Sequence, residues 1–478
     1  MPKKSLALCL AAMLLSACAQ LPSVGPDYQV PALNLPANWT AAPATSAATG
    51  ELARWWRQLE DPLLDRLIDE ALAGSLDLRL AQSRLRQSRA ARQQSMSGFF
   101  PTLTTSVAGN RSKGAEAISV QQERTLYDAG FDASWEIDLF GATRRAVEAA
   151  TADQAASAAS LENTRVSLLA EVAQNYVDLR SYQQRLAIAR ANLDSQSTTL
   201  QITEWRNQAG LASRSDVEQA RSNREQTRAG IPDLEVGLTA AGNRLAVLLG
   251  RHPGALLGEL REVRPLPVVK AAIGAGIPAD VLRQRPDLRA AERTLAAETA
   301  RVGQKLAARY PSLALGGSFG WQAYSLAALG GSDTLLRAVS GSLAATLFDG
   351  GKLRAAVAIQ SAVQEQALIS YEASVLGALE EVENALTAYA AAHERVAARR
   401  AAADAARNAA QLARNLYESG LTDFQKVLET ERTRLSTEDS LATAEATVLS
   451  SLIKLYKALG GGWQVAAPTP EPEESRNS

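Results

Sequence analysis

The sequence has few of the residues from which reactive and metal-binding centres are built. Two cysteines, two histidines and three methionines occur among its 478 residues. Thiolate and imidazole groups are the common ligands of zinc, and cysteine and histidine form common nucleophile and base pairs. We therefore expect no catalytic residues, no metal site and no diffusible cofactor, and we expect the protein not to be an enzyme.

An excess of charge of one sign is also missing. The chain carries 50 lysines and arginines against 51 aspartates and glutamates, so that its formal net charge is -1. General binding of nucleic acid requires a clustered basic excess that neutralises phosphates. Nucleic acid is therefore not an expected partner.

Long hydrophobic runs are missing after residue 18. A membrane-spanning helix needs about 20 predominantly apolar residues, and no stretch of the mature chain comes near this length. If the mature chain crosses a membrane, we expect it to do so with β-strands.

The N-terminal residues have the order of a secretory signal. Two lysines precede an apolar stretch over residues 6–15, which is too short to span a bilayer, and the sequence LSAC follows. LSAC resembles the bacterial lipobox. The resemblance implies cleavage before Cys18, with S-diacylglycerol and N-palmitoyl groups on that cysteine, and Ala19 beside it favours the outer membrane. An ordinary cleavage site near Ala17 is the alternative.

An internal repeat is the strongest feature of the sequence. Residues 77–103 align without a gap on residues 287–313, at an offset of 210, and nine of the 27 positions are identical. Ordinary composition predicts about two identities. The same offset relates Gly210-Leu211 to Gly420-Leu421. The chain is therefore predicted to contain two copies of one unit of about 210 residues.

Apolar residues recur every seven positions within each copy, a spacing that is typical of coiled-coil packing. The first register in the first copy comprises Val172, Leu179, Leu186, Leu193 and Leu200. Neither proline nor glycine occurs between Thr143 and Arg206, so that one helix of roughly 95 Å is predicted there. Gly210 and Gly420 are predicted to turn the chain between two helices of a long hairpin. Pro232 predicts a kink or a helix end near residues 229–231.

A period of two marks the predicted strands. From Phe131 to Leu139 apolar residues alternate with polar ones, which include three acids. This alternation is typical of a membrane barrel strand with lipid on one side and water on the other. Residues 339–347 repeat the pattern, and partner strands are predicted near 103–111 and 313–321.

Four membrane strands cannot close a barrel by themselves. An open edge in lipid leaves backbone groups without hydrogen bonds, at a cost of several kcal/mol each. The chain must then assemble with copies of itself. A dimer would give eight strands and a trimer twelve, and strand arithmetic alone does not choose between them.

Several long segments carry a family resemblance: VGPDYQVPALNLPANW at 24–39, WWRQLEDPLLDRLIDEAL at 55–72, RPDLRAAE at 285–292 and ALGGGW at 458–463. Together with the two glycine turns, they resemble the TolC-like outer membrane factors, and specifically the NodT-type efflux outer membrane lipoproteins. The resemblance implies a homotrimer with a twelve-stranded outer-membrane β-barrel, continued by a long α-helical barrel in the periplasm of a Gram-negative bacterium. The implied partners are a periplasmic adaptor and an inner-membrane pump, most often of the resistance-nodulation-division class, and the implied cargo is small toxic molecules.

The resemblance and the strand pattern together assign candidate site residues. The adaptor-docking tips comprise Gly210, Leu211, Gly420, Leu421 and Asp423, the periplasmic gate comprises Asp216 and Glu429, and the barrel lumen is lined by Asp132, Glu136 and Asp138. The plain alternatives are turn glycines and solvated helical carboxylates. Lys426 stands where some members of the family carry a second acid, so a double acidic ring is not implied.

The expected organisation has six parts. They are a lipoprotein signal (1–17), an acylated extended segment (18–60), a first repeat (61–250), a connecting segment (251–280), a second repeat (281–462) and a disordered tail (463–478). The fold is expected to be mostly helical, with membrane strands in each repeat. A passive export channel is the function favoured, and the alternative is a lipid-anchored periplasmic coiled-coil scaffold without channel activity. A surface hydrolase is a weaker third possibility, because no nucleophile and base can be identified.

Overall fold

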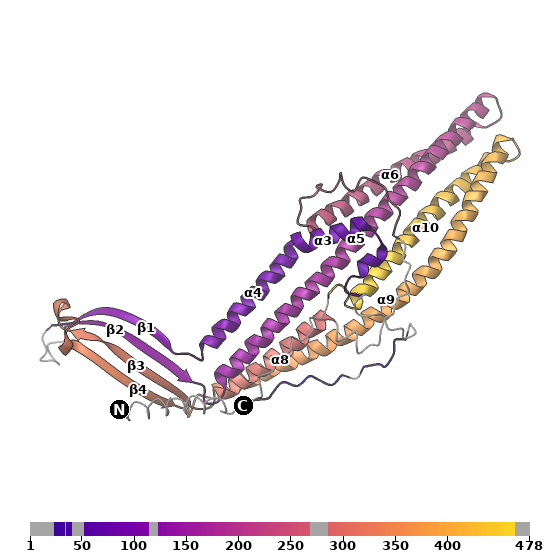
Figure 1. Ribbon diagram of the computed structural model, residues 1–478. Helices are drawn as coiled ribbons and strands as arrows, with labels where there is room; N and C mark the ends of the chain where they lie inside the picture. Colours follow the sequence, from indigo (N-terminus) through magenta and orange to yellow (C-terminus); the bar gives the residue numbers. More distant parts are fainter. Residues whose placement is uncertain (1–22, 34, 41–51, 114–122, 268–284, 464–478) are drawn as a thin grey trace, which may run out of the picture. The chain divides into compact units, whose positions relative to one another are not determined.

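The fold is described from a computed structural model over residues 23–33, 35–40, 52–113, 123–267 and 285–463 (Figure 1). The predicted signal, Cys18 and nearly all of the predicted tail lie outside these residues. The chain forms two compact units. One comprises residues 1–32, 83–158 and 289–373, and the other comprises 33–82, 159–288 and 374–478. Each unit therefore combines segments from both sequence repeats.

The helices confirm the predicted duplication. Helices α4 (Leu76–Ser97) and α8 (Pro286–Ala307) have 22 residues each, and α5 (Ala142–Gln208) and α9 (Lys352–Glu418) have 67 each. Helices α6 (Arg214–Leu248) and α10 (Phe424–Ala458) have 35 each. The members of every pair begin 210 positions apart, which is the offset read from the sequence.

The first unit contains one antiparallel sheet, in the order β1-β2-β3-β4 (Figure 1). Its strands are β1 (Thr102–Ser112), β2 (Arg124–Ile137), β3 (Ser312–Ala323) and β4 (Leu335–Ala344). The strands β1 and β3 confirm the predicted strands closely, while β2 begins seven residues before the predicted start at Phe131 and ends two residues before the predicted end, at Ile137. The prediction for the fourth was shifted: β4 begins four residues earlier and ends at Ala344, because the residues beyond it have no partner on β3, whose pairing starts at Ser312.

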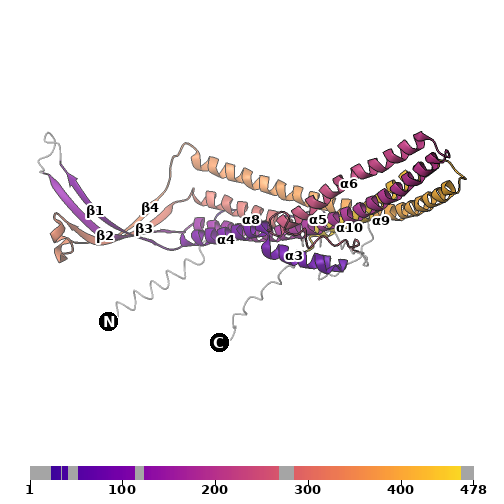
Figure 2. The ribbon, with the colours of Figure 1, turned by 90° about the horizontal axis from the view of Figure 1, so that it is seen from above.

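The second unit contains two helical hairpins, formed by α6 with residues 159–208 of α5 and by α10 with residues 374–418 of α9, whose turns lie at the same end in both views (Figures 1 and 2). The heptad residues face their neighbours: Val172, Leu179, Leu186 and Leu200 are all buried. Of the two alternatives predicted at Pro232, a kink or a helix end, the helix end is not found, because α6 continues through this residue. Proline removes one N–H donor, and residues 228–230 are exposed, so that water can satisfy the carbonyl that loses its donor.

A compact apolar core closes the other end of this unit. Asp61 accepts hydrogen bonds from the first backbone N–H groups of α3 (Pro62–Gly74), and Pro62 occupies the first helical position. The core contains the buried residues Trp55, Leu64, Leu67, Tyr176, Leu245 and Leu452. The Trp55 ring stacks on Tyr456 with 5.0 Å between centroids. The residues that carry the segment at 55–72 thus join its short helices to α5, α6 and α10.

No helix in the described part of the chain is both long and apolar enough to span a bilayer.

Candidate functional site

The sheet has one apolar and one polar face, as the strand register requires. Residues paired across antiparallel strands project from the same face, and Phe131 pairs with Phe319 while Gly317 pairs with Val339. The apolar face therefore carries Leu103, Val107, Phe131, Trp135, Leu315, Phe319, Val339 and Leu343. Two arginines on this face, Arg111 and Arg337, lie where β1 ends and β4 begins.

This apolar face covers no core. Val107 is 79% exposed and Val339 is 93% exposed. Among the described residues, the three clusters of buried apolar side chains contain no residue of a strand. An exposed apolar surface of this kind normally marks contact with a partner or a membrane.

The opposite face is polar and acidic. Asp132 pairs with Thr104 on one side and with Ser318 on the other, and Glu136 pairs with Ala314. Both carboxylates are exposed. Sequence reasoning missed Asp128, which lies four residues before Asp132 on the same face and accepts a hydrogen bond from Gln322 at 2.5 Å. The three acids recur every fourth residue, and the longer β2 strand explains why the first was not included.

Asp138 differs from the other two predicted lumen residues. It follows Ile137, the last residue of β2. Its carboxylate accepts hydrogen bonds from the backbone N–H of Arg144 at 2.9 Å and from Nε of Arg144 at 3.2 Å. The Asp138 side chain is only 11% exposed, and it stabilises the first turn of α5.

The two hairpin turns have the same backbone geometry. Gly210 and Gly420 have φ angles of 73° and 75°. The N–H of Leu211 donates to the Arg206 carbonyl at 2.7 Å, and the N–H of Leu421 donates to the Leu416 carbonyl at 2.8 Å. This six-to-one bond is typical of a glycine that ends a helix. Both leucines are exposed, at 68% and 75%, so each turn presents one apolar side chain.

The acidic tip residues cap the helices that follow the turns. The Asp216 carboxylate accepts from the Ser213 backbone N–H at 2.9 Å, while Ser213 Oγ accepts from the Asp216 N–H at 3.1 Å. In the second hairpin Asp423 alone caps α10, by accepting from the Lys426 N–H at 3.0 Å. Lys426 Nζ lies 3.1 Å from the exposed Glu429 carboxylate. Two of the predicted gate and tip acids thus have capping roles, and the third is paired with a lysine.

Three charged layers within the second hairpin were missed from the sequence. Arginines at 400, 407 and 414 on α9 face glutamates at 445, 438 and 431 on α10, with distances of 2.9, 3.0 and 3.1 Å between the charged atoms. Successive members are seven residues apart on both helices, and this period of charged residues could have identified them. We call these pairs the charged layers.

The charged layers also bind the first hairpin through α5. Thr199 Oγ1 donates to Glu431 at 2.6 Å, Asn192 Nδ2 donates to Glu438 at 3.1 Å, and Gln184 Nε2 donates to Glu445 at 3.1 Å. Burial of Glu438 acts to raise the pKa of its carboxyl. Its hydrogen bond from Asn192 and the charges of Arg434 and Arg407 prevail, and the pKa lies below its ordinary value.

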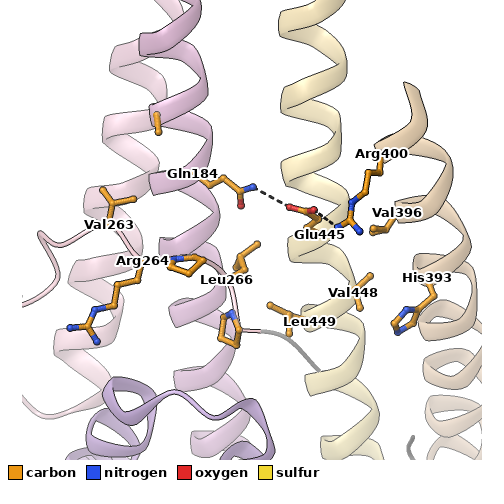
Figure 3. Close-up of a pocket in the computed structure, with 13 residues that line it drawn as sticks. Gln184, Val263, Arg264, Leu266, His393, Val396, Arg400, Glu445, Val448 and Leu449 are labelled. Carbon is orange, nitrogen blue, oxygen red and sulfur yellow. Dashed lines mark hydrogen bonds and ion pairs between the residues drawn. The ribbon is translucent and has the colours of Figure 1, made fainter. Parts of the chain in front are cut away.

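A cavity of about 640 Å³ adjoins the Arg400–Glu445 layer (Figure 3). It lies between α5, α9, α10 and the loop at residues 263–267. Glu445 projects toward it but is bound by Arg400 and Gln184 (Figure 3). His393 stacks edge-on against Tyr389 at 4.6 Å. Glu445 and His393 are thus engaged in contacts between the helices. No nucleophile and base are brought together among the residues that line the cavity.

Comparison with known proteins agrees with this architecture. The family described as outer membrane efflux protein matches residues 67–251 and 277–461, so its two matches begin 210 residues apart. Nodulation protein T of Rhizobium leguminosarum bv. viciae is 32% identical over 460 residues, which are 95% of this chain and 94% of that protein. The pyoverdine export outer membrane protein OpmQ of Pseudomonas aeruginosa is 31% identical over 476 residues, 97% and 98% of the two chains.

Solved structures give the same result. The outer-membrane channel OprN has a TM-score of 0.85 and 37% identity, over 92% of this chain and 99% of its own. The open state of the MtrE outer membrane channel of Neisseria gonorrhoeae has a TM-score of 0.82 and 28% identity, over 92% and 99% of the two chains. The chain therefore belongs to the outer membrane efflux protein family, and it is a TolC-like outer-membrane channel component of an efflux system.

Proposed function

We propose that three copies of this chain close a twelve-stranded barrel and form a passive export duct for small toxic compounds. The observation that carries the proposal is the open, two-faced sheet: β1 and β4 are its edges, its apolar face is uncovered, and its other face is acidic. Unpaired strand edges are costly in lipid. Edge pairing with identical chains satisfies them and turns the acidic face toward an aqueous bore.

Within this duct, Asp132 and Glu136 face the bore, and Asp138 lies where the strand meets α5. Three chains would place six strand carboxylates from these two positions on the inner surface. Rings of carboxylates favour cations over anions in a pore. We therefore infer that the membrane part of the duct conducts cations better than anions.

The tips are the proposed contact with a periplasmic adaptor. Leu211 and Leu421 are exposed apolar side chains on rigid glycine turns, a combination that suits insertion between helices of a partner. Asp216 and Glu429 are the proposed gate. Because Lys426 lies against Glu429, a ring of three Glu429 residues would be partly neutralised, and its mutual repulsion would be reduced.

The cargo and the partners are inferred from relatives. One matched relative is named for toluene efflux and another for pyoverdine export. Small organic molecules are therefore the proposed cargo here, supplied by an inner-membrane pump, of the resistance-nodulation-division class in our proposal, through the adaptor. We further propose that Cys18 carries S-diacylglycerol and N-palmitoyl groups that anchor the chain in the outer membrane.

Conductance of the purified protein in planar bilayers tests the proposal. The wild type is expected to purify as a trimer with stable, cation-preferring conductance. The double variant Asp132→Asn, Glu136→Gln should keep the conductance and lose several-fold in cation preference. Asp69→Asn, which changes an exposed acid of α3, is the matched control and should keep the preference. A monomer without conductance would overturn the proposal and favour the periplasmic scaffold.

A further inference from the structure

The first unit holds a short N-terminal segment, residues 23–28, against the beginning of α5 and against α8. We call this segment the strap. It forms no helix or strand, yet the backbone N–H of Val24 donates to the Phe140 carbonyl at 3.1 Å. Phe140 lies between the end of β2 and the start of α5. The strap therefore begins at the junction between the sheet and the helices.

Arg145 is the main contact of the strap. Its side chain is only 4% exposed. Nε donates to the Val24 carbonyl at 3.3 Å, and Nη2 donates to the Gly25 carbonyl at 3.3 Å and to Asp27 at 2.7 Å. Nη1 donates to Glu148 at 2.7 Å. A buried guanidinium is stabilised when charge-assisted bonds use all of its nitrogens, and three of the four bonds here go to the strap.

Glycines allow the strap to lie this close. Gly25 has a φ of 101°, and a Cβ on it would lie 2.4 Å from Cα of Gly303 on α8. A Cβ on Gly303 would in turn lie 2.9 Å from Nε of Arg145. Gly141 has a φ of 84°, and its Cβ would lie 2.6 Å from Cβ of Ser23. Side chains at these positions would displace the strap.

The far end of the strap is bound as well. Tyr28 Oη donates to Glu292 at 2.5 Å, and the Arg293 guanidinium lies 5.5 Å from the Tyr28 ring. Glu292 and Gly303 are eleven residues apart on α8, which corresponds to about 16 Å along the helix. The strap thus runs along α8, and its upstream end, rather than its downstream end, lies next to the strands.

From this geometry we propose that the strap is a clamp that fixes the membrane anchor to the base of the membrane strands, with Arg145 as its positioning residue. The proposal rests on the acylation of Cys18 proposed above. Cys18 lies five positions before Ser23, so the chain between their Cα atoms can span at most about 17 Å. The acyl chains must then enter the bilayer beside the point where β2 meets α5.

The consequence concerns assembly. An anchor confined close to the strands holds their periplasmic ends at the membrane surface and raises their effective concentration there. A freely hinged leash would allow the sheet to leave the membrane and would expose its apolar face to water. The clamp therefore makes trimer formation depend on both the lipid and Arg145. The effects of removing the lipid and of replacing Arg145 on the rate of trimer formation are then not additive.

A double-mutant cycle in the full chain tests the clamp, with the rate of trimer formation in cells followed by pulse labelling and heat-modifiable mobility. Arg145→Met is expected to slow trimer formation at least fivefold in the acylated chain. In a Cys18→Ala chain that carries an ordinary cleavage signal, trimer formation should already be slow, and Arg145→Met should slow it by less than a further twofold. Hydrogen exchange at the backbone N–H of Val24, which donates to the Phe140 carbonyl, should rise at least tenfold in Arg145→Met.

Two further variants separate clamping from folding. Arg301→Met removes a contact of α8 with Asp153 on α5, at the same end of the fold, without touching the strap. It should slow assembly by the same factor in both backgrounds. Asp27→Asn leaves Arg145 in place and should show a smaller effect than Arg145→Met, again only in the acylated chain.

Two results distinguish failure of the anchor proposal from failure of the clamp proposal. If mass spectrometry finds no acyl groups on the mature N-terminus, the anchor proposal itself is overturned. If the groups are present but Arg145→Met acts equally in both backgrounds, the clamp alone is overturned and Arg145 has a purely structural role.

Discussion

The two hairpins of the second unit come from one repeated sequence but use their charges differently. In the α9/α10 hairpin the glutamates of the Arg414–Glu431, Arg407–Glu438 and Arg400–Glu445 layers are 5%, 9% and 25% exposed. In the α5/α6 hairpin the Glu204–Arg221 and Arg190–Glu235 pairs correspond to the Arg414–Glu431 and Arg400–Glu445 layers, and all four side chains are at least 41% exposed.

The sequence offset sharpens this comparison. Glu204 and Arg221 correspond to Arg414 and Glu431, so that the sign of each charge has been exchanged while the pair is kept. Between the Glu204–Arg221 and Arg190–Glu235 pairs, Ser197 and Arg228 stand where the second hairpin has Arg407 and Glu438. Arg228 pairs instead with Glu225 on its own helix. Charges at an exposed pair can change sign or disappear at little cost. Charges buried against α5 cannot, because each is bound by several partners.

The largest effect is therefore expected at a buried charged layer. Glu431→Ala leaves the partly buried Arg414 without its carboxylate and should destabilise the protein by about 3 kcal/mol. Arg221→Ala, at the corresponding position of the first hairpin, should cost less than about 1 kcal/mol. Chemical denaturation of the detergent-solubilised protein measures both. Equal losses would contradict the difference drawn between the hairpins.

The two glycine turns, unlike the charged layers, should respond to substitution with similar losses of stability. Gly210→Ala and Gly420→Ala place a Cβ on a residue with positive φ, and each should cost about 1–2 kcal/mol. Gly377→Ala, in the interior of α9 with open space around it, should stabilise by about 0.5–1 kcal/mol. Thermal unfolding of the three variants is the measurement. A stabilised turn variant would show that the left-handed conformation is not required.

The N-terminal caps of α6 and α10 differ by one hydrogen bond, which the Asp216 carboxylate accepts in α6 alone. Ser213→Ala and Asp423→Ala should each cost about 1 kcal/mol, because each removes a side-chain acceptor at a helix N-terminus. Asp216→Ala should add a smaller loss in the first hairpin only, since Lys426 at the corresponding position accepts no such bond. Protease sensitivity of the turns, compared with that of the wild type, reports the loss locally. Similar losses for Asp216→Ala and Lys426→Ala would contradict the assignment.

The smallest effect is expected from protonation of Glu438, which keeps the side chain and changes one charge. Its carboxyl has a pKa below the ordinary value of 4.5. A depressed pKa in the folded state contributes stability that is present above pH 4.5 and is lost as the pH falls through the folded pKa. Melting temperatures measured from pH 6 to pH 3 should show this loss, and Glu438→Gln should reduce its slope. If the slope of melting temperature against pH were unchanged in Glu438→Gln, the loss of stability in acid would be due to other groups.

Much of the fold could be read from the sequence because it follows from short periods. The seven-residue spacing of Val172 and its successors predicted the long helices, and the alternation around Trp135 predicted the face of β2. The end of β4 could not be read, since it depends on which residues of β3 are available for pairing. The continuation of α6 past Pro232 could not be read either, because the exposure of the preceding turn to water is a tertiary property.

The candidate site was predicted less completely. The strand acids Asp132 and Glu136 follow from alternation alone, whereas the contacts of Asp138 and Asp216 depend on local capping geometry. The strap contact of Arg145 joins residues about 120 positions apart in the chain, and no periodicity signals such a pair. The charged layers had a readable period, but a period of charges is ordinarily that of a solvated helix face.

The spacing of the charged layers restricts how α10 can move along α9. A shift by one helical turn would separate all three ion pairs at once, because they share one register, and only a shift of seven residues, about 10 Å, would bring two of them back into register. Axial sliding of α10 is therefore opposed at every small displacement. Bending or rotation of the hairpin as a whole leaves these pairs intact. The tip can therefore move in these ways without breaking an ion pair.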